Sequence, residues 1–399
     1  MSYCLLVGSW RLPTKEEHLG KLQLKRPIPS SPKRALNVGV FRRLISPLDL
    51  YCYLQARFGR PNGFQNLLKS DSSDNLIHWQ YELLCGEDWL DISGFTTSVH
   101  IRFWTDKPLT KQDWSEFAAN VKRDFSSYGE RKSKALKALE KWRLFINPYK
   151  RIKDATDNLS RDVAKLASRE FPKVDLPSKK SQFRRYEILV KEKIENNRAL
   201  QEKGLALKFL TPVLAESFVN MIIFLTCKPE VRGNERVYQD TVRKQIDIRV
   251  ATMPLFCVGF PRGIDINSDQ YKDFKRVMDS RNDFLHGNVD PIRFGFEDVY
   301  FDNKTPLFKE GHDLVDMISQ NALRFIEPNT LIAELEAVRK FCNYILDQMH
   351  PYLRQGAEVL LDSVELGWNT SDRRIGALLS PNMAEMMLGD ISNVFYDDI

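Results

Sequence analysis

The sequence predicts an α+β protein, with a mixed α/β N-terminal domain followed by a mainly helical region that ends in an all-α bundle. Three observations favour this class. Short alternating apolar runs with turn residues fill the first part, a basic stretch of helical periodicity follows, and a strongly apolar helical stretch comes last. At 399 residues and 43% hydrophobic content, the chain has room for two or three domains. We expect domains at 1–126, 127–203 and 204–399.

The N-terminal elements follow from alternation and from turn residues. HLGKLQLKRP (18–27) and ALNVGVF (35–41) are typical of strands, and PLDLYCYLQARFG (47–59) is typical of a helix that ends at its glycine. Two longer runs, 75–85 and 89–104, are rich in β-branched and aromatic residues. They predict two further strands.

The middle region predicts three helices. Leu136, Leu139, Trp142 and Ile146 recur at helical spacing, and a second apolar stripe runs from 152 to 166. Pro148 lies between the two stripes and indicates that two helices meet there. The stretch 171–182, with two prolines and several lysines, predicts a loop, and 183–202 predicts a third helix.

The C-terminal region predicts a compact helical bundle over 204–360. Pro212 indicates a break or kink in its first helix. The expected helices are 204–226, 240–260, 268–287 with an N-cap at Asn267 or Ser268, and 328–349, with an irregular stretch at 291–313. The most apolar run, 218–227, is about half as long as a membrane span requires, and we expect no membrane association.

Charge divides the chain into a basic middle and an acidic end. Residues 121–200 hold 22 Lys and Arg against 11 Asp and Glu, a net +11, whereas residues 281–399 hold 10 against 20, a net −10. A basic middle suits binding to a phosphate backbone, and it equally suits the solvated faces of ordinary helices. The sequence leaves open whether the acidic C-terminal tail, 391–399, covers a functional cleft.

The six cysteines are far apart and form no CxxC pair, which argues against a zinc ribbon or a thioredoxin-type site. A secretion signal has a basic segment ahead of its apolar run and a cleavage site after it, and the N-terminus shows neither. We expect a cytoplasmic protein with no metal and no cofactor.

The stretch RNDFLHG at 281–287 places two functional side chain types at the end of a predicted helix. Arg281 falls on the apolar stripe of Phe274, Val277 and Met278, where a core residue is expected, so it needs a partner, a cleft or a subunit interface. Asn282 lies one turn before His286, where its amide can bond to the imidazole. Gly287 suits the left-handed position just past a helix end.

This stretch resembles the signature of the HEPN superfamily, in which Arg, a polar residue, about three further residues and His lie near the end of the third helix of a bundle. The form with Asn after Arg and Gly after His is similar to the ApeA-like branch. The helical pattern of 204–360 fits the same resemblance. GSWRLP followed by LGKLQL is also similar to the opening of ApeA-like N-terminal domains.

The resemblance implies a metal-independent endoribonuclease that works as a homodimer, with RNA as its substrate and a role in antiphage defence or growth arrest. Arg281, His286 and Asn282 would carry the chemistry. Three basic residues earlier in the helix, Lys272, Lys275 and Arg276, could bind RNA. Glu216 and Asn220, polar residues in an apolar helix, could bond to Arg281 or His286, with Gly287 as structural support.

Two other functions stay open on the sequence. In one, the Arg and His only cap the helix and seal a dimer interface, so that the protein is a non-catalytic, nucleic-acid-binding regulator. In the other, the chain is a toxin held silent by a separate antitoxin. A phage-derived trigger is a further expected partner of the ribonuclease.

Overall fold

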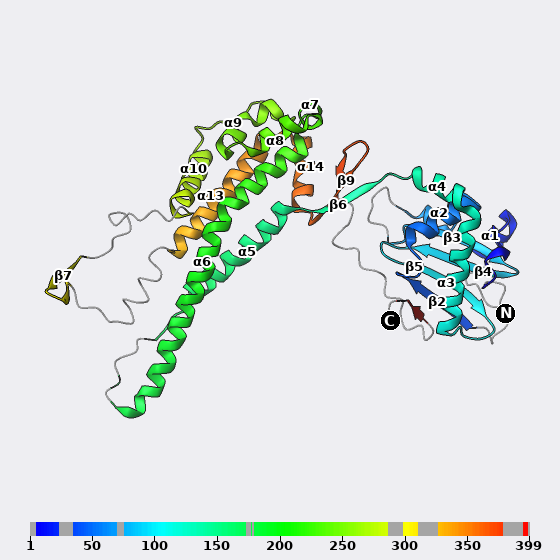
Figure 1. Cartoon of the computed structure of the whole chain (residues 1–399), viewed down its shortest axis with the longest axis horizontal. Coiled ribbons are helices and arrows are strands. Elements are labelled where there is room, and N and C mark those ends of the chain that lie inside the picture. The colour runs from blue at the N-terminus through cyan, green and yellow to red at the C-terminus, as the bar shows by residue number, and fades with distance from the viewer. Residues whose placement is uncertain are drawn as a thin grey trace. The chain divides into compact units, whose positions relative to one another are not determined.

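The computed structural model describes residues 5–23, 35–69, 76–172, 177, 179–285, 298–309, 326–377 and 394–397. The chain folds into two compact units (Figure 1). Unit 1 comprises Met1–Leu144 and Gly367–Ile399, and unit 2 comprises Phe145–Leu366. Because the chain contains both helices and sheets, the predicted α+β class is confirmed.

The two units divide the chain differently from the three domains expected at 1–126, 127–203 and 204–399. The first boundary falls at Leu144 and the second at Leu366, so the C-terminal residues belong with unit 1. The expected boundary at 203/204 falls inside one continuous helix.

Unit 1 is built on a six-stranded sheet. Its strands are β1 (Trp10–Arg11), β2 (Ala35–Phe41), β3 (Trp79–Cys85), β4 (Asp88–Gly94), β5 (Val99–Thr105) and β11 (Val394–Tyr396). Their order across the sheet is β1-β3-β4-β5-β2-β11. The first five pair antiparallel, whereas β11 runs parallel to β2 and closes the sheet on that side.

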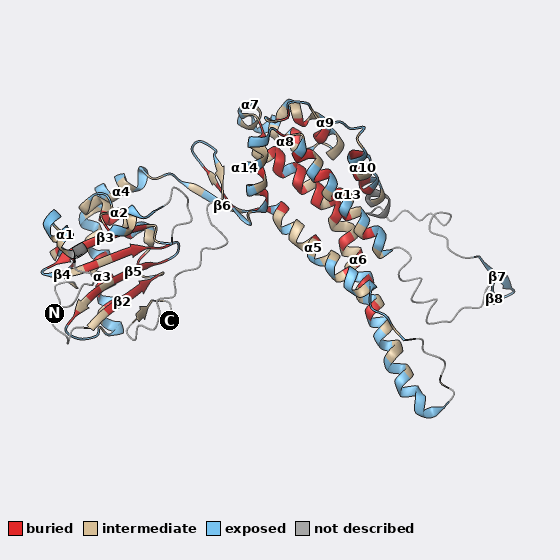
Figure 2. Cartoon of the chain, turned by 180° about the vertical axis from the view of Figure 1, so that it is seen from behind, coloured by how far each residue is buried: buried red, intermediate tan, exposed pale blue. Residues whose placement is uncertain are grey.

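The helices of unit 1 cover the sheet and share one core with it. They are α1 (Lys15–Gln23), α2 (Pro47–Phe58), α3 (Lys111–Phe125) and α4 (Gly129–Lys137), with 3₁₀ turns at Val7–Ser9, Phe64–Leu67 and Ser126–Tyr128. Tyr53 of α2 and Trp114 and Phe117 of α3 are buried in that core with strand residues such as Phe103. Figure 2 shows the strands of this sheet coloured largely as buried. Packing of this kind supplies most of the stability of such helices.

The prediction of a strand at 18–27 is wrong, because residues Lys15–Gln23 form α1. The helix start is specified locally. The Thr14 hydroxyl accepts from the Glu17 N–H at 3.2 Å, and the Glu17 carboxylate accepts from the Thr14 N–H at 2.7 Å. This reciprocal capping favours a helix in the segment that is expected to be a strand.

The single strand expected at 89–104 is two strands, β4 and β5, which are joined by a turn after Gly94. Helix α3 was not predicted from the sequence. This helix too begins with a reciprocal cap, in which the Thr110 side chain accepts from the Asp113 N–H and the Asp113 carboxylate accepts from the Thr110 N–H. Strand β2 and helix α2, by contrast, confirm the predictions.

Unit 2 is a helical bundle. Its helices are α5 (Pro148–Ala167), α6 (Phe183–Thr226), α7 (Pro229–Gly233), α8 (Glu235–Arg243), α9 (Ile246–Phe256), α10 (Asp269–Leu285), α13 (Pro328–Asp347) and α14 (Pro351–Asp362). Helices α5 and α6 lie antiparallel, because Lys203 bonds to Asp162 at 2.6 Å and Asn196 donates to the Leu166 carbonyl at 3.2 Å. Because α5 and α13 lie at the expected positions, the helices predicted at 152–166 and 328–349 are confirmed.

Helix α6 runs unbroken for 44 residues, so the predicted helix end near residue 202 is wrong. Of the break or kink expected at Pro212, the break is wrong as well. Both sites are held by packing. Pro212 is buried within the helix, and a methyl group on Gly204 would lie 2.0 Å from Ile326 Cγ2. Gly204 is therefore the place where α6 comes close to Ile326. From the sequence alone, the same glycine suggests a helix end.

Three other expectations for the helical regions are wrong. The stripe that ends at Trp142 and Ile146 is not one helix, since α4 stops at Lys137 and Trp142–Ile146 forms strand β6. This strand pairs in a small sheet of order β10-β9-β6, with β9 at Glu365–Asn369 and β10 at Ile375–Gly376.

The helix expected at 240–260 is two helices, α8 and α9. The irregular stretch at 291–313 contains a hairpin, β7 (Val299–Asp302) and β8 (Thr305–Phe308).

Among the described residues, one helical stretch, Lys180–Thr226, is long and apolar enough to cross a membrane. Of its most apolar window, 61% is buried inside the protein. The core helix of a soluble protein has the same properties, so the stretch is weak support for a membrane span.

The cysteines differ in state. Cys85 takes part in a disulfide, whereas Cys52, Cys227, Cys257 and Cys342 are buried free thiols.

Two glycine substitutions test the packing of α6. Gly204→Ala should lower the free energy of unfolding by about 1–3 kcal/mol, because the new methyl group overlaps the branched Ile326 side chain. Gly356→Ala in α14 meets no atom within 4 Å and should raise it by about 0.4–1 kcal/mol. Urea denaturation of both variants measures the effect. Equal gains in stability would show that α6 does not pack closely at Gly204.

Candidate functional site

Helix α10 carries the first part of the RNDFLHG motif, and its position is set by aromatic packing. The Ser268 hydroxyl accepts from the Tyr271 N–H at 3.3 Å, which identifies Ser268 as the N-cap. One turn on, the Phe274 ring stacks on Phe341 of α13 with centroids 3.9 Å apart and planes 9° apart. Val277 and Met278 are also buried, so the predicted apolar stripe is confirmed as far as Met278.

A polar contact fixes the same helix near its end. Lys208 of α6 donates to the Ser280 hydroxyl of α10 at 3.0 Å and forms an ion pair with Glu334 of α13 at 2.5 Å. The Lys208 and Glu334 side chains are only 13% and 16% exposed. Because the pair is largely shielded from solvent, it holds three helices together one residue before Arg281.

The motif itself is only partly described. Arg281 and Asn282 lie on α10, one turn beyond Met278, and the structure describes their backbone but not their side chains. His286 and Gly287 lie outside the described residues. The expected contact between Asn282 and His286, and the helix end at Gly287, therefore stay predictions.

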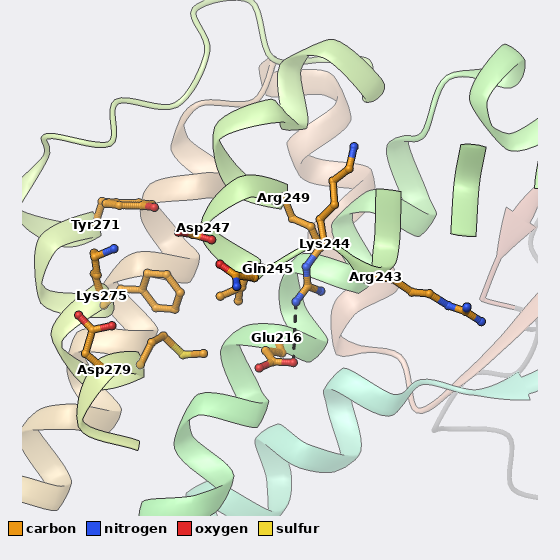
Figure 3. Close-up of a pocket in the computed structure, with 12 residues that line it drawn as sticks. Glu216, Arg243, Lys244, Gln245, Asp247, Arg249, Tyr271, Lys275 and Asp279 are labelled. Atoms are coloured by element: carbon orange, nitrogen blue, oxygen red, sulfur yellow. Dashed lines mark ion pairs between the residues drawn. The ribbon is translucent and has the colours of Figure 1, made fainter. Parts of the chain in front are cut away.

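A pocket of about 480 Å³ is lined by residues of α6, of α10 and of the segment that joins α8 to α9 (Figure 3). Helix α10 contributes Tyr271, Lys275 and Asp279 to this lining. This volume is within the range of small-ligand sites. Its charged lining residues are the basic Arg243, Lys244, Arg249 and Lys275, and the acidic Glu216, Asp247 and Asp279. The side chains of Arg243 and Lys244 extend away from the centre of the pocket in Figure 3.

Arg249 of α9 is the most buried charge in this lining, with 6% of its side chain exposed. Burial lowers the pKa of Arg249, and the nearby Glu216 carboxylate opposes that shift. A carboxylate oxygen of Glu216 lies 3.8 Å from the Arg249 guanidinium. The side-chain amide oxygen of Asn220 accepts a hydrogen bond from the same guanidinium. Within the described part of the chain, the buried Arg249 Nε atom has no hydrogen-bond partner. An unsatisfied buried donor costs free energy, which the surrounding packing must offset.

From the sequence, Glu216 and Asn220 are expected to bond to Arg281 or His286. The Arg281 side chain and His286 are not described, so this stays a prediction, and the described partner of Glu216 and Asn220 is Arg249, which the sequence pattern did not single out. The signal that picks out Arg281, a basic residue among apolar helical positions, was also present at Arg249, which lies between Ile248 and Val250 in the chain. The Lys208 and Glu334 pair had no such local signal.

The three basic residues proposed to bind RNA differ in their surroundings. Lys272, Lys275 and Arg276 are all exposed on α10. Lys275 lines the pocket, whereas Arg276 is paired with Asp273 on its own helix. Lys275 is thus the one that lies next to the candidate site.

The opposite charges in the lining can bind different parts of one ligand. Arg249 and Lys275 can donate to anionic oxygens, and the carboxylates of Asp247 and Asp279 can accept from hydroxyl or amino groups. Burial raises the pKa of the neighbouring Tyr271, and both carboxylates raise it further, which keeps its hydroxyl protonated. Among the described residues, no group of three or more His, Cys, Asp or Glu side chains could hold a metal ion.

The Lys208 and Glu334 pair can be tested by a double-mutant cycle. Lys208→Met should lower the free energy of unfolding by about 1–3 kcal/mol, because the largely buried Glu334 carboxylate loses its partner. Adding Glu334→Leu should restore part of the loss, since both charges are then gone. Urea denaturation of the single and double variants measures the coupling. Strictly additive losses would mean that the two side chains do not interact.

Comparisons with known proteins do not place the chain in a family. No protein-family model matches it, and neither does any curated protein or solved structure. Its function is therefore inferred from its residues and their arrangement.

Proposed function

We propose that the protein is a metal-independent endoribonuclease of the HEPN type, in which Arg281 and His286 cleave RNA. One observation carries the proposal. The residues Arg281 and Asn282 of the RNDFLHG motif follow directly on the part of α10 that lines the mixed-charge pocket. A motif with both polar groups intact, next to a pocket with a buried cation, suits catalysis better than a purely structural helix cap.

The residue types suit transesterification of RNA. Histidine near neutral pH can take the proton from a ribose 2′-hydroxyl, whose oxygen then attacks the phosphorus. The bond from phosphorus to the 5′-oxygen breaks, and that oxygen leaves with a proton. Arginine stays charged and can stabilise the phosphate as negative charge develops. The products are a 2′,3′-cyclic phosphate and a 5′-hydroxyl, and neither a metal nor a cofactor is needed to balance the step.

The described residues supply the substrate contacts in this proposal. Arg249 and Lys275, which line the pocket, bind phosphate oxygens of the strand. Asp247 and Asp279 accept hydrogen bonds from sugar hydroxyls or base amino groups. We expect two copies of the chain to bring two such sites together, and the trigger or antitoxin proposed from the sequence would act on this dimer.

Replacement of the histidine tests the reaction. Purified protein should cut a mixed RNA pool, and His286→Ala should reduce cleavage by at least about a hundredfold, the lower end of what a general acid or base contributes. Gel analysis of labelled RNA measures the rates, and circular dichroism confirms that the bundle remains folded. Addition of EDTA should leave the rate unchanged.

Two outcomes would contradict the ribonuclease. Salt-sensitive RNA binding without cleavage, retained in Arg281→Ala, would favour the non-catalytic regulator. Loss of cleavage in EDTA would show that a metal takes part. A small protein that co-purifies with an inactive chain, and whose removal restores cleavage, would identify an antitoxin and keep the ribonuclease.

Arg249 should contribute to substrate binding. Arg249→Met removes a buried donor to phosphate and should raise KM by roughly ten- to a hundredfold, which corresponds to about 1.5–3 kcal/mol for a charged hydrogen bond. The control is Arg236→Met on the exposed face of α8, which removes the same charge outside the pocket. Steady-state cleavage kinetics separates the two variants. Equal effects on KM would mean that only the net charge of unit 2 matters.

A further inference from the structure

The C-terminal strand β11 completes the sheet of unit 1 from one side. It pairs parallel to β2, with Val394 opposite Val38, Phe395 opposite Gly39 and Tyr396 opposite Val40. Strand β2 pairs with β5 on its other side, so without β11 it would be an edge strand. Such an edge presents unpaired backbone groups and is a template for another extended segment.

An aromatic platform beside β2 receives the tail. The Phe395 ring stacks on Trp114 with centroids 5.7 Å apart and planes 12° apart, and it lies 5.7 Å from the Phe41 ring. Gly39, directly opposite Phe395, makes room for this platform. A methyl group on Gly39 would lie 2.6 Å from a ring atom of Trp114. The sequence of β2 is therefore fitted to an aromatic residue at this position.

A backbone anion site follows the aromatic platform. The Asp397 carboxylate accepts from the N–H groups of Arg42 and Arg43 at 2.8 Å each and of Leu44 at 2.5 Å. The Arg42 guanidinium also lies over the Tyr396 ring at 5.7 Å. Successive N–H groups that converge on one carboxylate form an anion-binding nest. The site thus recognises an aromatic residue and an aspartate two positions later.

The described part of the tail that occupies this site is short. Strand β11 spans three residues, and Val394 to Asp397 are each only partly buried. Covalent attachment compensates for a small interface, because it gives a tethered segment an effective concentration in the millimolar range. A short segment of this kind stays bound in its own chain yet can be replaced by a competitor with more contacts.

We propose that the side of β2 that pairs with β11, with the backbone nest at residues 42–44, is a docking site for extended peptides, and that the tail of this chain is its displaceable resident. The ligand class is an extended segment in which an aromatic residue precedes an aspartate by two positions. It would add a strand to the sheet, with main-chain bonds giving affinity and the platform and nest giving specificity. This site lies in unit 1 and does not depend on the ribonuclease chemistry.

Peptide binding tests the proposal directly. A fluorescent peptide of residues 389–399, GDISNVFYDDI, should bind a chain that lacks residues 391–399 and should bind the full chain at least about tenfold more weakly, since there the tail competes. Peptides with Phe395→Ala or Asp397→Asn should lose at least about tenfold in affinity, the factor that 1.4 kcal/mol represents. Asp398→Asn removes the same charge one position later and should bind like the native peptide. Fluorescence anisotropy gives all five constants.

The proposal is overturned if the folded, tail-deleted chain does not bind the peptide, if both chains bind it equally, or if Asp398→Asn weakens binding as much as Asp397→Asn. Should the tail-deleted chain fail to fold, hydrogen exchange on the full chain decides instead. Asp397→Asn should speed the exchange of the amides of residues 38–44 by about tenfold relative to Asp398→Asn. A tenfold change corresponds to the same 1.4 kcal/mol of lost binding free energy. Equal exchange in the two variants rejects the docking site.

Discussion

The proposed chemistry depends above all on how helix α10 is held. The stacked rings of Phe274 and Phe341 fix which side of the helix faces the core, and the Lys208, Ser280 and Glu334 contact anchors it one residue before Arg281. With this side fixed, the helical repeat places Tyr271, Lys275 and Asp279 on the pocket. Any rotation of α10 would remove these groups from the pocket and move the start of the motif with them.

The pocket contains charged side chains, and burial of such a charge raises its free energy. Arg249 is held by Glu216 and Asn220, yet one of its donors has no partner among the described residues, and the free energy for this arrangement must come from the surrounding apolar packing. Residues such as Phe218 and Val250, which are fully buried on α6 and α9, supply that packing. Local cost of this kind, offset by the core, is typical of sites that act on a ligand.

Sequence patterns predicted the elements whose signals are local. Helices α2 and α13 follow from their periodicity and caps, and the apolar stripe of α10 follows from spacing alone. Helix α1 was predicted as a strand from the run HLGKLQLKRP, although the Thr14 and Glu17 cap was already readable. Strand β6 could not be identified locally, since it is stabilised by pairing with β9 more than 200 positions later. For the same reason, the Lys208 and Glu334 partners, 126 positions apart, carry no pattern that links them.

Attack by the ribose 2′-hydroxyl is the central claim about this protein. A single 2′-deoxynucleotide placed at a mapped cleavage site removes that nucleophile and leaves the phosphate, the bases and the overall charge intact. The account predicts that cleavage at this position stops while neighbouring sites in the same RNA are still cut. Cleavage that continues at the 2′-deoxy position would show that water or another group attacks the phosphorus, and it would contradict the proposed function.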